Sequence, residues 1–417
     1  MKTMDNGFMA CWRKISYTLE INGSSTNDEF LIELINKLLD SYDFPLPLAK
    51  HTLKKEYPDQ AKKFLMQYWG DWSIKKFSSL RGHPASIGIP HEFRGESWLL
   101  VVRKSDWWNV DVVVDYFTEY ERLNTGKIYA PSVKESWKNK DIRMVILEKF
   151  VKSRKWTIEE LRDCIYRSSK EVSTFRPSRC VGFLTKIYNC SIPAMLSGKK
   201  WLDISAGWGD RLFTACGLGM SYMGFDPNTN LIPGHKEMIN RCGDQNLQQV
   251  FPYPFESEMV EKLLKLEINE RGLFDFCLTS PPFFDIESYN GRNQSTDNYP
   301  QFDTWLVDFL FVSLDRAWNC LKDDGYLAIN LANISGRDMV SPMVYFVNSL
   351  LGGSSWVGLL TFSGRSTQDS PGTLYVWQKK SKDTNYDKNE KDVNSWQSKI
   401  LADEYPGLHE KWITRSH

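Results

Sequence analysis

From residue 199 onward, short apolar runs alternate with stretches whose apolar residues recur at helical spacing. The seven runs are KWLDIS, SYMGFD, QQVFPYPF, LFDFCLTS, GYLAINLA, SWVGLLTF and TLYVWQ. Helix-like stretches separate the first five runs, whereas only a loop separates the last two. Because parallel strands need long crossovers and antiparallel strands need only a loop, this pattern predicts an α/β fold. We expect a seven-stranded, mostly parallel sheet with an antiparallel last hairpin.

The first 198 residues show a different pattern of apolar and polar residues. EFLIELINKLLDSYDF, at 29–44, has helical apolar spacing, and TIEE, beginning at Thr157, is typical of a capped helix start. Between 67 and 115, aromatic and β-branched residues are interrupted by Gly and Pro. We therefore predict four parts, which are an N-terminal α+β domain (1–150), a helical linker (151–198), the α/β domain (199–380) and a charged C-terminal tail (381–417).

Charge and cysteine content narrow the choice of class. Lys+Arg and Asp+Glu both number 52, so net charge indicates no polyanionic partner, although residues 121–200 hold 18 Lys/Arg against 8 Asp/Glu. That segment suits either a phosphate backbone or an ordinary solvated surface. The eight cysteines form no CxxC pair, which predicts reduced thiols and no metal site. Without a leader-like or membrane-spanning run, we expect a soluble intracellular protein, cytoplasmic or nuclear and not secreted.

The first run continues into WLDISAGWGDRLFTACGLG, residues 201–219. A strand that ends at Asp203, a turn with Gly207 and Gly209, and a helix would place backbone N–H groups around a ligand. Taken alone, this is equally an ordinary tight turn. The second run ends in GFDPN, where Asp226 lies 23 residues beyond Asp203, a spacing that lets an acid reach ribose hydroxyls. Since GxGxxG is missing, a mononucleoside fits better than a dinucleotide, and a capping role for Asp226 remains the alternative.

The fourth run ends in TSPPF, and this order of motifs resembles a known family. Over residues 199 to 378 the chain resembles S-adenosylmethionine-dependent DNA amino-methyltransferases of the N4-cytosine/N6-adenine type. The resemblance implies a Rossmann-like class I methyltransferase fold with S-adenosylmethionine as cofactor. It implies that the catalytic residues are Ser280, Pro281, Pro282 and Phe283, and that the cofactor-binding residues are Asp203, Ser205, Ala206, Gly207, Gly209, Asp226 and Pro227.

Two further stretches carry weaker expectations from the resemblance. TFRPSRC precedes the first strand where the family contacts the methionine carboxylate, which makes Phe175, Arg176, Pro177 and Ser178 candidates; a plain loop between helices is the alternative. PFE, at 254–256, ends the third strand where the family contacts adenine. Glu256 there can equally be a charge at a helix N-terminus.

The chemistry of the tetrapeptide agrees with this resemblance. A base amine is a weak nucleophile because its lone pair is delocalised into the ring. Ser280 Oγ and the Pro281 carbonyl can accept hydrogen bonds from its N–H groups, two prolines fix the backbone, and Phe283 can stack on a base taken out of its strand. A Pro-Pro strand terminator with core aromatics is the alternative reading.

The family's large recognition region is missing after the catalytic motif. We therefore assign substrate recognition to the N-terminal part and expect the polar loop 285–300 to act as a lid. The predicted partner is nucleic acid, with DNA favoured over RNA, and no membrane; oligomeric state stays open. An RNA base methyltransferase, a catalytically silent nucleic-acid-binding subunit and a small-molecule methyltransferase remain alternatives.

Overall fold

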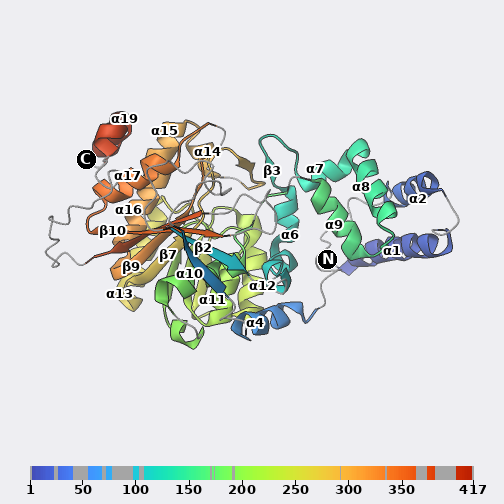
Figure 1. The fold of residues 1–417 in the computed structure, drawn as a ribbon, viewed down its shortest axis with the longest axis horizontal. Helices are drawn as coiled ribbons and strands as arrows, with labels where there is room; N and C mark the ends of the chain where they lie inside the picture. The colour runs from blue at the N-terminus through green and yellow to red at the C-terminus, as the bar shows by residue number, and fades with distance from the viewer. Residues whose placement is uncertain are drawn as a thin grey trace. The chain divides into compact units, whose positions relative to one another are not determined.

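The structure is a computed structural model of the 417-residue chain (Figure 1). It describes residues 2–22, 27–40, 55–67, 72–77, 97–102, 108–169, 171–172, 174–189, 193–291, 293–333, 336–362, 373–380 and 401–415. Contacts divide the chain into two units. Unit 1 comprises Met1–Tyr57, Val114–Ser173 and Glu287–Asn290, and unit 2 comprises Pro58–Val113, Thr174–Ile286 and Gly291–His417.

Unit 1 is built mainly from helices. Its elements are α1 (Lys2–Asn22), α2 (Asp28–Asp40), α6 (Asp115–Asn124), β3 (Gly126–Lys127), α7 (Val133–Lys138), α8 (Lys140–Ser153), α9 (Ile158–Ser168) and β8 (Glu287–Ser288). Helices α2 and α9 confirm two sequence predictions. Thr157 caps α9 by accepting a hydrogen bond from the Glu160 N–H at 3.2 Å. Buried apolar side chains of α1, α2, α8 and α9 form the core of this unit.

Unit 2 contains the large sheet and the helices around it. Its strands are β1 (Trp72–Phe77), β2 (Ser97–Val102), β4 (Lys200–Asp203), β5 (Ser221–Phe225), β6 (Gln248–Phe251), β7 (Phe274–Thr279), β9 (Leu321–Asn330), β10 (Ser354–Phe362) and β11 (Thr373–Lys379). Its helices are α4 (Tyr57–Gln67), α5 (Trp108–Asp111), α10 (Pro177–Tyr188), η4 (Pro193–Leu196), α11 (Asp210–Leu218), η5 (Thr229–Leu231), α12 (Ile232–Cys242), α13 (Glu258–Arg271), α14 (Ser295–Asn298), α15 (Phe302–Thr304), η6 (Trp305–Phe311), α16 (Val312–Asn319), α17 (Val340–Leu350), α18 (Leu401–Glu404) and α19 (Pro406–Arg415).

All seven predicted strands are present in this sheet. Across the sheet the strands run β1-β2-β10-β11-β9-β7-β4-β5-β6. Strands β6, β5, β4, β7 and β9 pair in parallel, and β11 pairs antiparallel with both β9 and β10. The seven strands from β4 to β11 therefore have the Rossmann-like class I methyltransferase order, with the antiparallel last hairpin that the sequence predicted.

The central strands are apolar on both faces, as strands between two helical layers must be. Trp201, Tyr222 and Phe276 are cross-strand neighbours whose rings lie 5.1–5.6 Å apart, and Phe183 of α10 packs against Phe276. The alternate residues, such as Leu202, join the opposite core with α13, α16 and α17. Figure 1 shows this sheet between its helices.

Two features of unit 2 were not anticipated. Strand β2 pairs in parallel with β10 and antiparallel with β1, so these two strands extend the large sheet although their sequence lies within the predicted N-terminal domain. In the predicted charged tail, α18 and α19 contribute Leu401 and Leu408 to the main core, and the Trp412 ring packs against Phe346 at 4.8 Å. The predicted domain boundaries at 150, 198 and 380 do not coincide with those of the two units and stay predictions.

Across the described ranges, no helix is both long enough and apolar enough to cross a membrane.

Candidate functional site

The glycine turn joins β4 to α11 in a conformation that requires glycine. Gly207 and Gly209 have φ of 57° and 101°, in the left-handed region that other residues avoid. A Cβ on Gly209 would also lie 2.9 Å from Met238 Cε of α12. Nothing lies closer than 3.8 Å to a Cβ placed on Gly207. Gly209 thus permits close helix packing, whereas Gly207 leaves open space at the end of β4.

Asp203, a predicted cofactor contact, is instead saturated by protein donors. Its side chain is fully buried. Its oxygens accept hydrogen bonds from Arg211 Nε at 2.6 Å, Tyr222 Oη at 2.6 Å, Thr279 Oγ1 at 2.9 Å and the Ser205 N–H at 3.2 Å. Desolvation lowers the pKa of Arg211, but its partners, above all the Asp203 carboxylate, more than offset this and raise that pKa, so Arg211 stays protonated. We interpret Asp203 as a residue that positions the turn, because it has no room to accept from a ligand.

Asp226 lies at the end of β5 and is only partly satisfied. The N–H groups of Gly207 and Asn228 donate to its two oxygens at 2.8 and 2.9 Å. Burial raises the pKa of Asp226 to about 6. A carboxylate has about four acceptor positions. Two therefore remain for donors such as ribose hydroxyls, and the half-buried side chain is accessible to them.

His235 of α12 supports the same turn and was not identified from the sequence. Its Nε2 lies 2.9 Å from the Gly207 carbonyl oxygen, and burial lowers its pKa to about 4. A neutral ring donates from Nε2 to that carbonyl, which leaves Nδ1 as a buried acceptor with no protein partner among the described residues. No sequence motif marked His235, because its role depends on how α12 packs on the turn.

The Ser-Pro-Pro-Phe segment follows β7 directly and adjoins the glycine turn. Thr279, the last residue of β7, donates a hydrogen bond to Asp203, the last residue of β4. Ser280 therefore directly follows the residue that joins the two strand ends. Ser280 Oγ accepts a hydrogen bond from Asn330 Nδ2 at 3.0 Å. Asn330 is buried at the carboxyl end of β9. The sequence predicted Ser280 but not Asn330, which lies 50 residues further along the chain.

An aromatic group holds the backbone just after this segment. Phe284 has φ of 48°, a strained conformation for a residue with a side chain. Its ring packs edge-on against Phe302 at 5.3 Å and Trp305 at 5.6 Å, and the Arg337 guanidinium lies 4.7 Å from its centroid. Trp305 begins the π-helix η6. Phe284 is thus anchored inward, while Pro282 and Phe283 beside it are half-exposed.

The segment before β4 makes several contacts within the protein. The Phe175 ring is buried, 5.2 Å from the Arg211 guanidinium, and Arg176 precedes α10, which begins at Pro177. The Asp111 carboxylate accepts hydrogen bonds from the Ser178 N–H at 2.9 Å and from Ser178 Oγ at 2.7 Å. An internal carboxylate therefore occupies the first N–H of this helix, and contact of residues 175–178 with a cofactor stays a prediction.

PFE does not end the third strand as predicted, because β6 ends at Phe251 and Glu256 lies five residues beyond it. Burial raises the pKa of Glu256, and its Oε2 is buried without a hydrogen-bond partner in the described part of the chain. Gly291, in the loop 285–300, approaches the turn after Asp226 so closely that a Cβ would lie 2.8 Å from Asn228 Cγ. The loop therefore packs against the residue two positions beyond Asp226.

These residues share one edge because β5, β4, β7 and β9 are adjacent and parallel. Their carboxyl ends carry Asp226, the glycine turn, Ser280 and Asn330, respectively. Open α/β sheets bind ligands at this edge. At this edge, unit 2 thus presents the Asp226 carboxylate, the backbone N–H groups of the glycine turn and the Ser280 hydroxyl, which is hydrogen bonded to the Asn330 amide.

Comparisons with known proteins found structural likenesses only. No family model and no curated protein matches the chain. Solved structures similar to it include an rRNA methylase from Streptococcus thermophilus (13% identity, 50% of this chain and 100% of that chain, TM-score 0.31). Others are TrmN from Thermus thermophilus (13%, 50% and 50%, 0.32) and a methyltransferase homolog protein from Pyrococcus horikoshii (12%, 45% and 64%, 0.32). The chain thus spans about half the length of TrmN. Because these TM-scores are low, the similarities add no argument about the fold. The order of the strands in the sheet is what identifies it.

Proposed function

We propose that this protein transfers a methyl group from S-adenosylmethionine to the exocyclic amine of a nucleic-acid base, N4 of cytosine or N6 of adenine. The main support for the proposal is the hydrogen bond from Thr279 to Asp203. It joins the glycine turn after β4, beside Asp226, to the Ser-Pro-Pro-Phe segment after β7. DNA is the polymer that the sequence favours, and RNA is the alternative.

The residues present fit the cofactor that this fold implies. Asp226 retains acceptor capacity for two ribose hydroxyls, and Gly207 leaves space for a ligand to approach the backbone. Glu256 offers a buried acceptor at the next strand end, suited to an adenine amine. When bound, S-adenosylmethionine supplies an electrophilic methyl group on a sulfonium.

The substrate side follows from the geometry around Ser280. Asn330 Nδ2 uses one lone pair of the Ser280 hydroxyl oxygen, so the second lone pair can accept from a base amine. The Pro281 carbonyl is a second acceptor, and half-exposed Phe283 provides a ring on which a base can stack. Asn330 is therefore a positioning residue, whereas Ser280, Pro281 and Phe283 contact the substrate.

The deciding experiment identifies the methylated base. The full chain is incubated with methyl-labelled S-adenosylmethionine and either DNA or RNA, the polymer is digested to nucleosides, and the label is assigned by mass spectrometry. We expect N4-methylcytosine or N6-methyladenine from one polymer. If the protein binds the cofactor but labels neither polymer, the proposal is wrong.

Two variants assign the roles at the segment. Ser280→Ala and Phe283→Ala should abolish transfer while cofactor affinity stays at the wild-type value, since neither residue contacts the cofactor in this proposal. Phe283→Trp is the matched control, because it keeps a ring for stacking and should retain transfer. Full transfer by Phe283→Ala would remove base stacking from the mechanism.

A further inference from the structure

Two apolar side chains project into solvent at the turn between α6 and α7. Lys127 and Ala130 exchange backbone hydrogen bonds, each of 2.9 Å, which closes a two-residue turn with Ile128 and Tyr129 at its tip. Their side chains are 48% and 75% exposed. Among the large apolar side chains that the structure describes, Tyr129 has the highest exposed fraction. Single exposed apolar side chains are common on protein surfaces, but here Ile128 and Tyr129 project next to each other from one turn.

The turn is anchored on both sides. Gly126 and Lys127 pair with Ser288 and Glu287. On the other side, Ser132 and Glu135 form a capping box at the start of α7, with hydrogen bonds of 2.8 and 3.1 Å. The backbone that carries Tyr129 is therefore fixed, so a ligand that stacks on the ring would cost little backbone conformational entropy.

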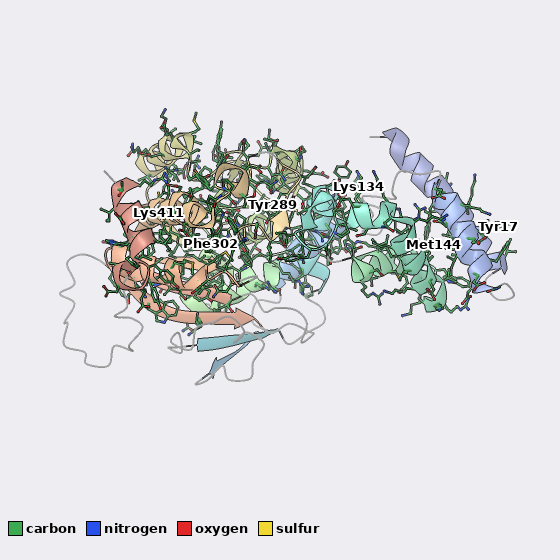
Figure 2. All side chains as sticks on the ribbon, turned by 90° about the horizontal axis from the view of Figure 1, so that it is seen from above. Tyr17, Lys134, Met144, Tyr289, Phe302 and Lys411 are labelled. Atoms are coloured by element: carbon green, nitrogen blue, oxygen red, sulfur yellow. The ribbon has the colours of Figure 1, made fainter. Side chains whose placement is uncertain are left out.

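The sequence around this turn is rich in lysine. Between residues 126 and 140 the chain holds four lysines and a single acid, Glu135. Lys134, labelled in Figure 2, lies 5.3 Å from the ring centroid of Tyr120, which is 54% exposed. A second acid, Glu287, faces Lys127 and accepts a hydrogen bond from Tyr289 Oη at 2.8 Å. The balance stays positive, and aromatic rings among lysines are typical of surfaces that bind single-stranded nucleic acid.

We propose that the turn 127–130 and Tyr120 bind single-stranded nucleic acid, with Tyr129 stacking on a base and the lysines contacting phosphates. The inference rests on the proposed function and adds the contact that holds the polymer. A protein partner fits less well, because side chains at a two-residue tip cannot supply the roughly 800 Å² per partner of a stable interface.

The test measures binding of the full chain to a fluorescein-labelled single-stranded oligonucleotide by fluorescence anisotropy. Tyr129→Ala should weaken the affinity ~5- to 150-fold, the effect of losing one stacked base. Tyr129→Phe keeps the ring and should bind like wild type. Tyr17→Ala is the matched control, since Tyr17 on α1 is 66% exposed (Figure 2) and should have no effect.

Each outcome separates the two proposals. If the wild type binds the oligonucleotide and Tyr129→Ala binds equally well, the inference is wrong and the proposed function stands. If Tyr129→Ala instead lowers the molecular mass in solution without changing oligonucleotide affinity, the turn joins two copies of the chain and the inference is also wrong. If the wild type binds neither DNA nor RNA, both proposals are overturned.

Discussion

Asp203 and Asp226 end neighbouring parallel strands, yet their surroundings differ. Asp203 is fully buried and accepts four hydrogen bonds from Arg211, Tyr222, Thr279 and Ser205. Asp226 is half-buried and accepts two, both from backbone N–H groups. The same residue type near the ends of two adjacent strands therefore holds the turn together in one case and keeps acceptor positions for a ligand in the other. Counting donors separates the two roles, whereas the sequence pattern assigned both to the cofactor.

The largest effect is expected from Asp203→Asn. The substitution leaves the buried Arg211 guanidinium without its counter-charge, which costs about 3–5 kcal/mol in the free energy of unfolding. Urea unfolding followed by tryptophan fluorescence should show a much lower midpoint. Asp226→Asn is the matched control and should not lower the midpoint, because the ionised form of Asp226 is the one that burial disfavours. A stable Asp203→Asn protein that fails only to bind cofactor would show that Asp203 contacts the ligand.

Asp226→Asn should instead weaken S-adenosylmethionine binding by about 100-fold, because hydrogen bonds to a charged acceptor contribute about 1.5–3 kcal/mol each. Isothermal titration calorimetry measures this change directly. An unchanged affinity would leave Asp226 as a cap of the turn at Asn228, the alternative that the sequence raised.

The smallest expected effect is the pH dependence of folding stability and cofactor affinity that Asp226 causes. With a pKa of about 6, raised from 3.8, the folded protein binds this proton more tightly than the unfolded chain. The group's contribution to folding stability therefore rises as pH falls from 6 towards 4. Cofactor affinity should fall over the same range, because protonation removes an acceptor of the ribose hydroxyls.

Calorimetry and urea midpoints between pH 5 and 8 test these opposite trends. Subtracting the Asp226→Asn curves removes contributions of other groups such as Glu256. His235, with a pKa of about 4, stays mostly neutral in this window. Trends of the same sign for affinity and stability would contradict the assignment.

The sequence predicted the fold well because its signals are local. Each of the seven strands is a short apolar run with its own flanking turn or helix, so periodicity located all of them. The pairing of β2 with β10 could not be predicted in this way. Their paired residues Ser97 and Leu359 are far apart along the chain, and nothing in either run specifies the other.

The residues of the candidate site also fall into two groups, those within short motifs and those that act through distant packing partners. Gly207, Asp226 and Ser280 lie within short motifs and could be located from the sequence. Asn330 and His235 act through packing partners from distant segments, so no spacing pointed to them. Similarly, the hydrogen bond between Asp111 and Ser178 is a long-range contact that no motif indicated.

The added strands β1 and β2 have a consequence for how the chain folds during synthesis. Strand β2 ends at Val102, and its partner β10 begins only at Ser354. At about 5–20 residues per second, the ribosome needs on the order of 10–50 s to supply that partner. Throughout this interval the Ser97–Val102 edge has no β10 to pair with, and unpaired edges recruit other chains. Slower elongation, or a shortage of chaperones, should therefore reduce the soluble yield of this protein more than its final stability would suggest.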